Sequence, residues 1–182
     1  FLPCGESDIE CMICRDTDSR INQREVDATN NWLKSGKTLH VMRDHPHHNF
    51  KISGGMWGWR NSNKLYTNIE SDIIKFMNNK PFVRMDDMYF LYKVWDAMLG
   101  DIIAHDSVFD YPDSQRFPND EFHKKKIYHN FIGEMYDEYG KRITYDRDIK
   151  LFQEMNFSQL KQKTVQRLRE VINNNTTKLI IK

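Results

Sequence analysis

A short apolar run followed at once by two spaced carboxylates constrains this sequence more than any other feature. Residues 11–14 (CMIC) have low polarity, and the string RDTDSR follows directly at residues 15–20. A run this short between polar residues predicts a β-strand that is covered on both faces. Carboxylates at its carboxyl end can converge on one hard cation, because Mg²⁺ and Mn²⁺ favour carboxylate oxygens. We therefore expect a divalent-cation site at Asp16 and Asp18. The alternative is a capped turn in which Arg15 and Arg20 are surface ion-pair partners.

Length and charge exclude several classes of function. The 182 residues suffice for one domain with a substantial core, so we predict a single domain over residues 1–182. The net charge of +1 predicts no broad electrostatic field for nucleic acid. No apolar run approaches the roughly 20 residues that span a bilayer, and no secretory signal opens the chain. We expect a cytoplasmic protein. Because the first residue is Phe1 rather than methionine, we also consider that the chain is a piece of a longer protein.

The three cysteines lie within the first 14 residues. An odd number clustered at one end argues against a disulfide framework and for a reducing compartment. Cys11 and Cys14 have the spacing of half a zinc site, but the sequence has no second pair. We interpret these cysteines as structural.

The hydrophobic periodicity predicts helices and strands that alternate along the chain. Such alternation predicts an α/β fold with a mostly parallel sheet. The segment from 109 to 128 reads as a long loop, and residues 127–136 as a strand or an ordered loop. Besides the strand at 11–14, we expect strands at 38–42, 102–104 and 179–181, and helices at 22–35 (ended by Gly36), 69–78, from 86 to Gly100, and after Ser158.

Polar residues follow three of the predicted strands. In open α/β sheets the ligand crevice lies outside the carboxyl ends of the strands, so these residues are expected to meet there. Less specific interpretations remain open, namely a local salt bridge between Arg43 and Asp44 and a hydrogen-bonded, half-buried His105. The three pairs are Asp16 with Asp18, Arg43 with Asp44, and His105 with Asp106.

Two further segments could contribute to a site. The string GGMWG at residues 54–58 predicts a backbone that turns tightly or approaches a ligand closely, beside an aromatic wall. Its alternative is a turn held by buried tryptophans. Asp86 and Asp87 stand at a predicted helix start, where carboxylates also cap free amides.

Several strings in one order carry a family resemblance. RDTDSR, HVMRDHPHHN, GGMWGWR, MDDMYFLYKVW and HDS resemble the metal-dependent GT-A type glycosyltransferases of large DNA viruses of algae and amoebae and of some bacterial polysaccharide clusters. The resemblance covers roughly residues 8–133. It implies a GT-A-like, Rossmann-like sheet flanked by helices, and, for a viral protein, the host cytoplasm. It also implies transfer of a sugar from a nucleoside diphosphate-sugar donor to a glycan or other hydroxyl acceptor, with Mn²⁺ or Mg²⁺.

The same resemblance implies a role for each matching residue. For an inverting reaction, Asp87 or Asp86 would be the base that deprotonates the acceptor hydroxyl. The metal would be bound by Asp16 and Asp18, with His105 as a further ligand. The remaining implied roles are Arg15 and Arg20 at phosphate or ribose, Arg43 and Asp44 at sugar hydroxyls, and Gly54, Gly55, Met56 and Trp57 along the sugar and acceptor cleft.

The sequence departs from the family pattern in two places. Met88 follows Asp87 where the family has glutamine. Only 15 residues precede Asp16, so we expect either that the usual amino-terminal βαβ portion has been lost or left out, or that this is a reduced relative. Two other functions therefore stay open. One is an aspartate-nucleophile phosphatase, in which Asp16 attacks phosphorus and Asp18 is the acid/base. The other is a non-catalytic glycan-binding or structural module.

Overall fold

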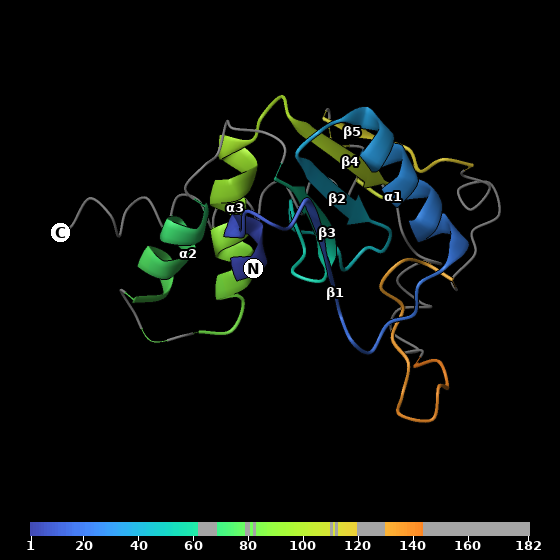
Figure 1. Cartoon of the computed structure of the whole chain (residues 1–182). Helices are drawn as coiled ribbons and strands as arrows, with labels where there is room; N and C mark the ends of the chain where they lie inside the picture. Colours follow the sequence, from blue (N-terminus) through green and yellow to red (C-terminus); the bar gives the residue numbers. More distant parts are fainter. Residues whose placement is uncertain are drawn as a thin grey trace. The chain divides into compact units, whose positions relative to one another are not determined.

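The fold is described from a computed structural model (Figure 1), which covers residues 1–61, 69–78, 81, 83–109, 111, 113–119 and 130–143. The chain forms two compact units, Phe1–Thr144 and Tyr145–Lys182, and all the described residues belong to the first. The predicted helix after Ser158, the predicted strand at 179–181 and residues 120–129 lie outside the described residues. The single domain over 1–182 stays a prediction.

A five-stranded mixed sheet forms the centre of the first unit, with the strand order β1-β3-β2-β4-β5. Strand β3 is antiparallel to both β1 and β2, whereas β2, β4 and β5 are parallel to one another. The α/β class is confirmed, and parallel pairing is found in the β2–β4–β5 part. Strands β1, β2 and β4 therefore point the same way and end at one edge, where β3 begins. The strands are β1 Cys11–Arg15, β2 Leu39–Arg43, β3 Met56–Arg60, β4 Ile102–Asp106 and β5 Ser114–Gln115.

Residues 11–14 form a strand as predicted, but the prediction that both faces of this strand are covered is wrong. β1 lies at the edge of the described sheet and pairs with β3. Met12 and Cys14 pack against the core, but Ile13 points to the other face and is 43% exposed. An antiparallel edge strand with one covered face produces this alternation.

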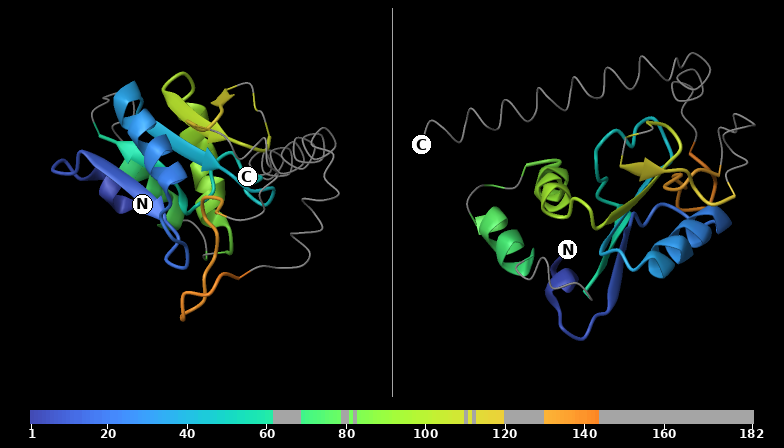
Figure 2. Two further views of the ribbon diagram at one scale, coloured as in Figure 1. Left: turned by 90° about the vertical axis from the view of Figure 1, so that its right-hand side faces the viewer. Right: turned by 90° about the horizontal axis from the view of Figure 1, so that it is seen from above.

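The helices lie on both faces of the sheet. In Figures 1 and 2, α2 and α3 lie on one side and α1 on the other. Helix α1 begins after Asn22, whose side-chain oxygen accepts a hydrogen bond from the Glu25 amide at 3.0 Å, and ends at Gly36 with a φ of 71°. The three helices predicted in the described part are confirmed. They are α1 Gln23–Ser35, α2 Ile69–Asn78 and α3 Asp86–Ala97, preceded by a short 3₁₀ helix, η1, at Leu2–Gly5.

Alternating strand residues divide the core into two clusters. The larger cluster joins Trp57 and Trp59 of β3 to the buried faces of α2 and α3, which include Phe90 and Trp95. The second cluster lies on the α1 side and consists of Ala28, Met42, Met56, Phe117 and Ile132. The sequence MWGWR thus forms an internal strand of the sheet that the sequence did not predict, because the nearby glycines suggested a turn.

Gly58 makes room for the largest side chain on the α1 side. A Cβ atom on Gly58 would lie 2.9 Å from two ring atoms of Trp32, which is fully buried. The Trp32 indole stacks on the His40 ring at 5.2 Å and donates a hydrogen bond to the Lys37 carbonyl at 2.8 Å. The absence of a side chain at Gly58 therefore sets how closely α1 approaches the sheet.

We predict that Gly58→Ala lowers the free energy of unfolding by about 1–3 kcal/mol, because the new methyl group overpacks the Trp32 site. Urea denaturation measures this change. In a Trp32→Leu background the same substitution should cost much less, since the smaller side chain leaves space. An equal cost in both backgrounds would show that the indole does not require the glycine.

Candidate functional site

Two adjacent glycines bring together carboxylates from distant parts of the sequence. Asp16 follows β1, and Asp87 lies in the first turn of α3. A Cβ atom on Gly55 would lie 2.2 Å from the Asp16 carboxyl carbon, and one on Gly54 would lie 2.4 Å from Asp87 Oδ2. Neither glycine has a positive φ, so close approach rather than a special turn requires them. The expected close approach is present, and its partners are the chain's own carboxylates.

The electrostatics of this cluster disfavour the charged form of Asp16. Partial burial raises the pKa of Asp16 above its usual value, the negative charges of Asp18 and Asp87 raise it further, and Arg15 opposes the shift. Oxygen ligands that repel one another bind a hard cation readily, because the cation relieves the repulsion. We refer to Asp16, Asp18 and Asp87 as the acidic cluster.

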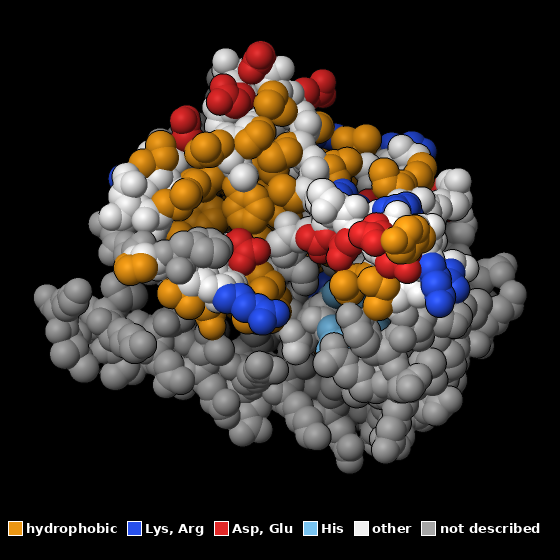
Figure 3. Space-filling view, turned by 90° about the horizontal axis from the view of Figure 1, so that it is seen from below, with side chains coloured by type: hydrophobic (Ala, Val, Ile, Leu, Met, Phe, Trp, Pro, Cys, Tyr) orange, Lys and Arg blue, Asp and Glu red, His pale blue; other side chains and the backbone are white. Residues whose placement is uncertain are grey.

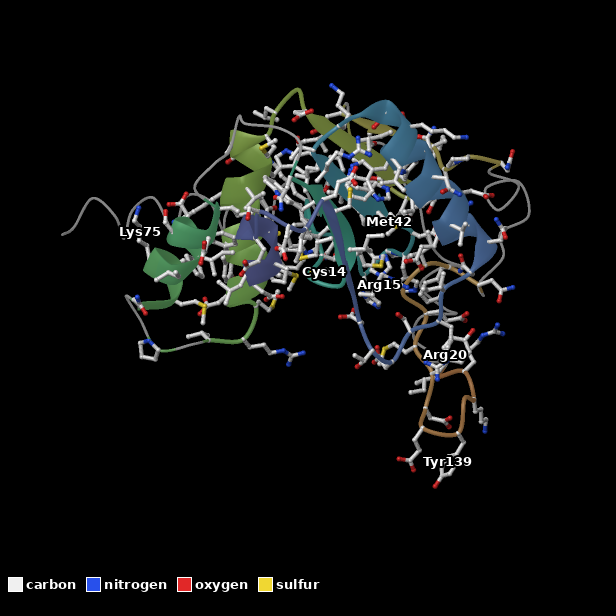
Figure 4. The ribbon with its side chains drawn as sticks, in the orientation of Figure 1. Cys14, Arg15, Arg20, Met42, Lys75 and Tyr139 are labelled. Atoms are coloured by element: carbon white, nitrogen blue, oxygen red, sulfur yellow. The ribbon has the colours of Figure 1, made fainter. Side chains whose placement is uncertain are left out.

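Arg15 supports the glycine segment from the strand side. Its Nη1 donates a hydrogen bond to the Gly55 carbonyl at 3.1 Å, and its Nε pairs with the Glu25 carboxylate of α1. The Arg20 side chain is exposed, and its guanidinium lies 5.4 Å from the centre of the Tyr136 ring. Figure 4 shows Arg15 at the end of β1 and Arg20 beyond it, beside the turn whose tip carries Tyr139. Arg15 is thus a positioning residue, whereas Arg20 faces solvent.

The loop that carries Asp16 and Asp18 is held by residues far away in the sequence. The Tyr136 amide donates a hydrogen bond to the Asp18 carbonyl at 2.7 Å, and Ser19 forms a β-bridge with Met135. The Ser19 hydroxyl closes the loop on the Asp16 carbonyl at 2.8 Å. Sequence reasoning missed this support for the acids, because a single β-bridge leaves no periodic pattern.

Asp44 does not form the local salt bridge with Arg43. It accepts two hydrogen bonds from Arg24 of α1, at 2.9 and 3.0 Å. The Ser107 hydroxyl and the Ile132 amide donate to the same carboxylate at 2.6 and 3.0 Å. Asp44 is therefore buried and occupied by protein donors, in contrast to the expected contact with sugar hydroxyls.

Arg43 is likewise occupied within the fold. Its side chain is fully buried, and Nε donates to Asp106 Oδ2 at 2.8 Å while Nη1 donates to the Lys51 carbonyl at 2.7 Å. Met56 and Trp57 are also buried, at 2% and 0% exposed. Of the segment expected to line a cleft, the two glycines border the acidic cluster and these two side chains belong to the core.

The structure does not bring His105 to Asp16 and Asp18. Its strand, β4, is three positions from β1 in the sheet, or roughly 14 Å at normal strand spacing. His105 Nδ1 lies 2.9 Å from His40 Nε2, and its Nε2 lies 3.1 Å from the side-chain oxygen of Asn31. His105 is a buried histidine in a polar network, which agrees with the hydrogen-bonded interpretation.

Asp86 and Asp87 have different surroundings although they are neighbours. Asp86 is 4% exposed, and its Oδ2 accepts a hydrogen bond from the Val83 amide at 2.8 Å. This contact caps the turn before α3. Asp87 is half-buried and meets Gly54. Of the two predicted candidates for a base, Asp87 is the one whose charge acts on Asp16.

The acidic cluster has the donor chemistry that Mn²⁺ and Mg²⁺ prefer, and the space at Gly55 admits the Asp16 carboxylate. In the described part of the chain, no three His, Cys, Asp or Glu side chains are already arranged to hold a metal ion.

No helix in that part is long and apolar enough to cross a bilayer. Comparison with protein-family models, with curated proteins and with solved structures gives no match.

The convergence of the acidic cluster predicts a change in the pKa of Asp16. In metal-free protein, Asp18→Asn should lower this pKa, and Asp87→Asn should lower it by less, because each change removes a neighbouring negative charge. Carboxyl-carbon NMR titration measures the shift. Asp96→Asn, on the exposed side of α3, is the control and should leave the value unchanged. An unchanged Asp16 pKa in Asp87→Asn would mean that the two carboxylates do not meet.

The paired histidines predict acid sensitivity of the fold. Burial lowers the pKa of His40 well below its usual value and lowers that of His105 to about 4. The unfolded chain therefore binds these protons more readily. The free energy of unfolding should fall as the pH drops below about 6.5, by up to about 1.4 kcal/mol per pH unit for each histidine. For His105 the fall ends near pH 4.

Urea denaturation between pH 7 and pH 5 tests this sensitivity. His105→Gln should flatten the pH dependence, because one of the histidines whose pKa is lowered by burial is gone, while His40 and His48 remain. A slope equal to that of the unmodified protein would assign the acid sensitivity to other groups.

Proposed function

We propose that this chain is the sugar-transfer domain of a metal-dependent glycosyltransferase of GT-A type. Its reaction would move a sugar from a nucleoside diphosphate-sugar donor to a hydroxyl of a glycan or other acceptor. The observation that carries the proposal is the meeting of Asp16 and Asp87 at Gly54 and Gly55. One carboxylate follows the strand with the Asp-x-Asp sequence, and the other begins a helix, as the family resemblance implies for metal ligand and base.

Asp16 and Asp18 would hold the Mn²⁺ or Mg²⁺ ion in this proposal. When bound, the ion supplies Lewis-acid stabilisation of the leaving diphosphate. Arg15 keeps Gly55 in place beside Asp16 through the hydrogen bond to its carbonyl. Arg20, which is exposed next to the acidic loop, is available to a phosphate group of the donor.

Asp87 would accept the proton of the acceptor hydroxyl in an inverting reaction. A general base must lie within hydrogen-bond reach of the proton that it removes, and Asp87 is half-buried beside the segment next to the metal ligands. Asp86 fixes the helix start that carries Asp87 through the Val83 amide. Asp86 is thus proposed as a positioning residue rather than as the base.

The surroundings of Asp16 support sugar transfer over aspartyl-phosphate chemistry. An aspartate-nucleophile phosphatase also needs a downstream lysine beside the nucleophile. The cation whose charge reaches Asp16 is instead the adjacent Arg15, which is engaged by Glu25 and by the Gly55 carbonyl. The charges that reach Asp16 from other segments include a further carboxylate, Asp87. That arrangement fits a site in which a bound cation balances the acids.

Two substitutions should separate metal binding from proton transfer. We predict that Asp18→Ala abolishes Mn²⁺-dependent binding of UDP and all donor turnover, while the domain stays folded. Asp87→Asn should keep metal-dependent binding and slow transfer by about 10²- to 10⁴-fold, because it removes a general base. Calorimetry measures binding, and release of nucleoside diphosphate from a panel of nucleotide-sugars measures turnover.

Asp96→Asn is the matched control, since it changes an exposed carboxylate of the same helix as Asp87. Retained turnover of the nucleotide-sugar donor in Asp18→Ala would contradict the proposal. A phosphorylated Asp16 trapped with a phosphate ester would favour the phosphatase. An unmodified protein that binds nucleoside diphosphates with no dependence on metal would favour a non-catalytic module.

A further inference from the structure

A hollow lined by apolar side chains opens beside the acidic cluster. It has a volume of about 330 Å³ and lies among η1, α2 and α3. Figure 3 shows this face, where hydrophobic side chains surround a depression and acidic side chains stand at its edge. The apolar lining is contributed by Phe1, Leu2, Ile73, Phe76, Met77 and Phe90.

Part of this lining is rigid and part is open to solvent. Ile73 and Phe90 are 6% and 4% exposed and belong to the larger core cluster, so packing within the core holds the floor of the hollow in place. Leu2 and Met77 are 48% and 63% exposed. An occupant would therefore cover apolar surface that water now contacts, which is a favourable change.

The charged part of the lining consists of Asp86 and Asp87. Because the Asp86 carboxylate accepts a hydrogen bond from the Val83 amide just before α3, it is held by the backbone. Asp87 also meets Gly54, so one carboxylate borders both the hollow and the acidic cluster. No basic side chain contributes to the described lining, and an anionic occupant would be repelled by the two acids.

We infer that this hollow binds the uncharged apolar group of the acceptor, an alkyl or aryl aglycone, with the acceptor's sugar hydroxyl directed to Asp87. The inference rests on the proposed sugar transfer and adds the class of acceptor. A carboxylate accepts a hydrogen bond from a hydroxyl, while the six apolar side chains bind the aglycone through buried area. Such an acceptor would be an amphiphilic glycoside rather than a free, fully polar sugar.

Binding of alkyl β-D-glucosides of increasing chain length tests the hollow without metal or donor. Calorimetry below the critical micelle concentration should show affinity that rises about fourfold per methylene group from hexyl to octyl, as expected for burial of CH₂ groups. Glucose itself should bind at least about tenfold more weakly than the octyl glucoside. Affinity that does not depend on chain length would overturn the inference.

Matched variants locate the binding. Met77→Glu should weaken octyl glucoside binding by about tenfold or more, since it places a charge against the alkyl chain. Leu2→Glu should act in the same direction. Leu99→Glu is the control, because Leu99 is 64% exposed, like Met77, but does not line the hollow. Equal affinities in Met77→Glu and Leu99→Glu would contradict the assignment to this hollow.

A competition experiment separates this inference from the proposed function. UDP with Mn²⁺ should leave octyl glucoside binding unchanged, because donor and acceptor occupy different places. Displacement of the glucoside by UDP and Mn²⁺ would overturn the acceptor assignment. Chain-length-dependent binding in a protein that shows no metal-dependent nucleotide binding would leave the hollow as an apolar glycoside site and refute the glycosyltransferase.

Discussion

One buried carboxylate, Asp44, joins four parts of the chain. It follows β2, pairs with Arg24 of α1, and accepts hydrogen bonds from Ser107 after β4 and from the Ile132 amide. Removing one partner of such a buried pair typically costs about 3–5 kcal/mol, because the other charge is left without compensation. The position of residues 130–143 depends on this carboxylate, and those residues in turn hold the loop with Asp18.

The acidic cluster is therefore assembled from two separately supported halves. The backbone around Tyr136 holds the loop of Asp16 and Asp18, and the hydrogen bond from the Val83 amide to Asp86 holds the turn before Asp87. The halves meet where β3 begins, at two residues without side chains. Like charges that are forced together in this way store electrostatic repulsion, and a bound divalent cation would release it. In the proposed function, that release would be the free energy by which a cation binds to this site.

Local pattern was sufficient for the described helices and for strands β1, β2 and β4, and it missed β3 and β5. Gly36 predicted the end of α1, because a glycine that ends a helix acts through its own backbone conformation. β3 was missed because Gly58 makes room for Trp32, and Gly54 and Gly55, just before the strand, make room for Asp87 and Asp16. Contacts of this kind leave no periodicity in the sequence. For the same reason the sequence suggested binding roles for Arg43, Asp44 and His105, whose partners are distant residues of the fold. Asp16 and Asp87 could be proposed from their settings, whereas the distinction between Asp87 and Asp86 required the structure.

The central claim is that the acids at Gly54 and Gly55 form one divalent-cation site. Paramagnetic broadening of NMR signals by substoichiometric Mn²⁺ tests it most directly, because the effect falls steeply with distance from the ion. The account predicts that signals of Asp16, Asp18, Gly55 and Asp87 broaden first, while those of His105, about three strand spacings from β1, persist. Preferential broadening at His105, or equal broadening over the whole surface, would contradict it.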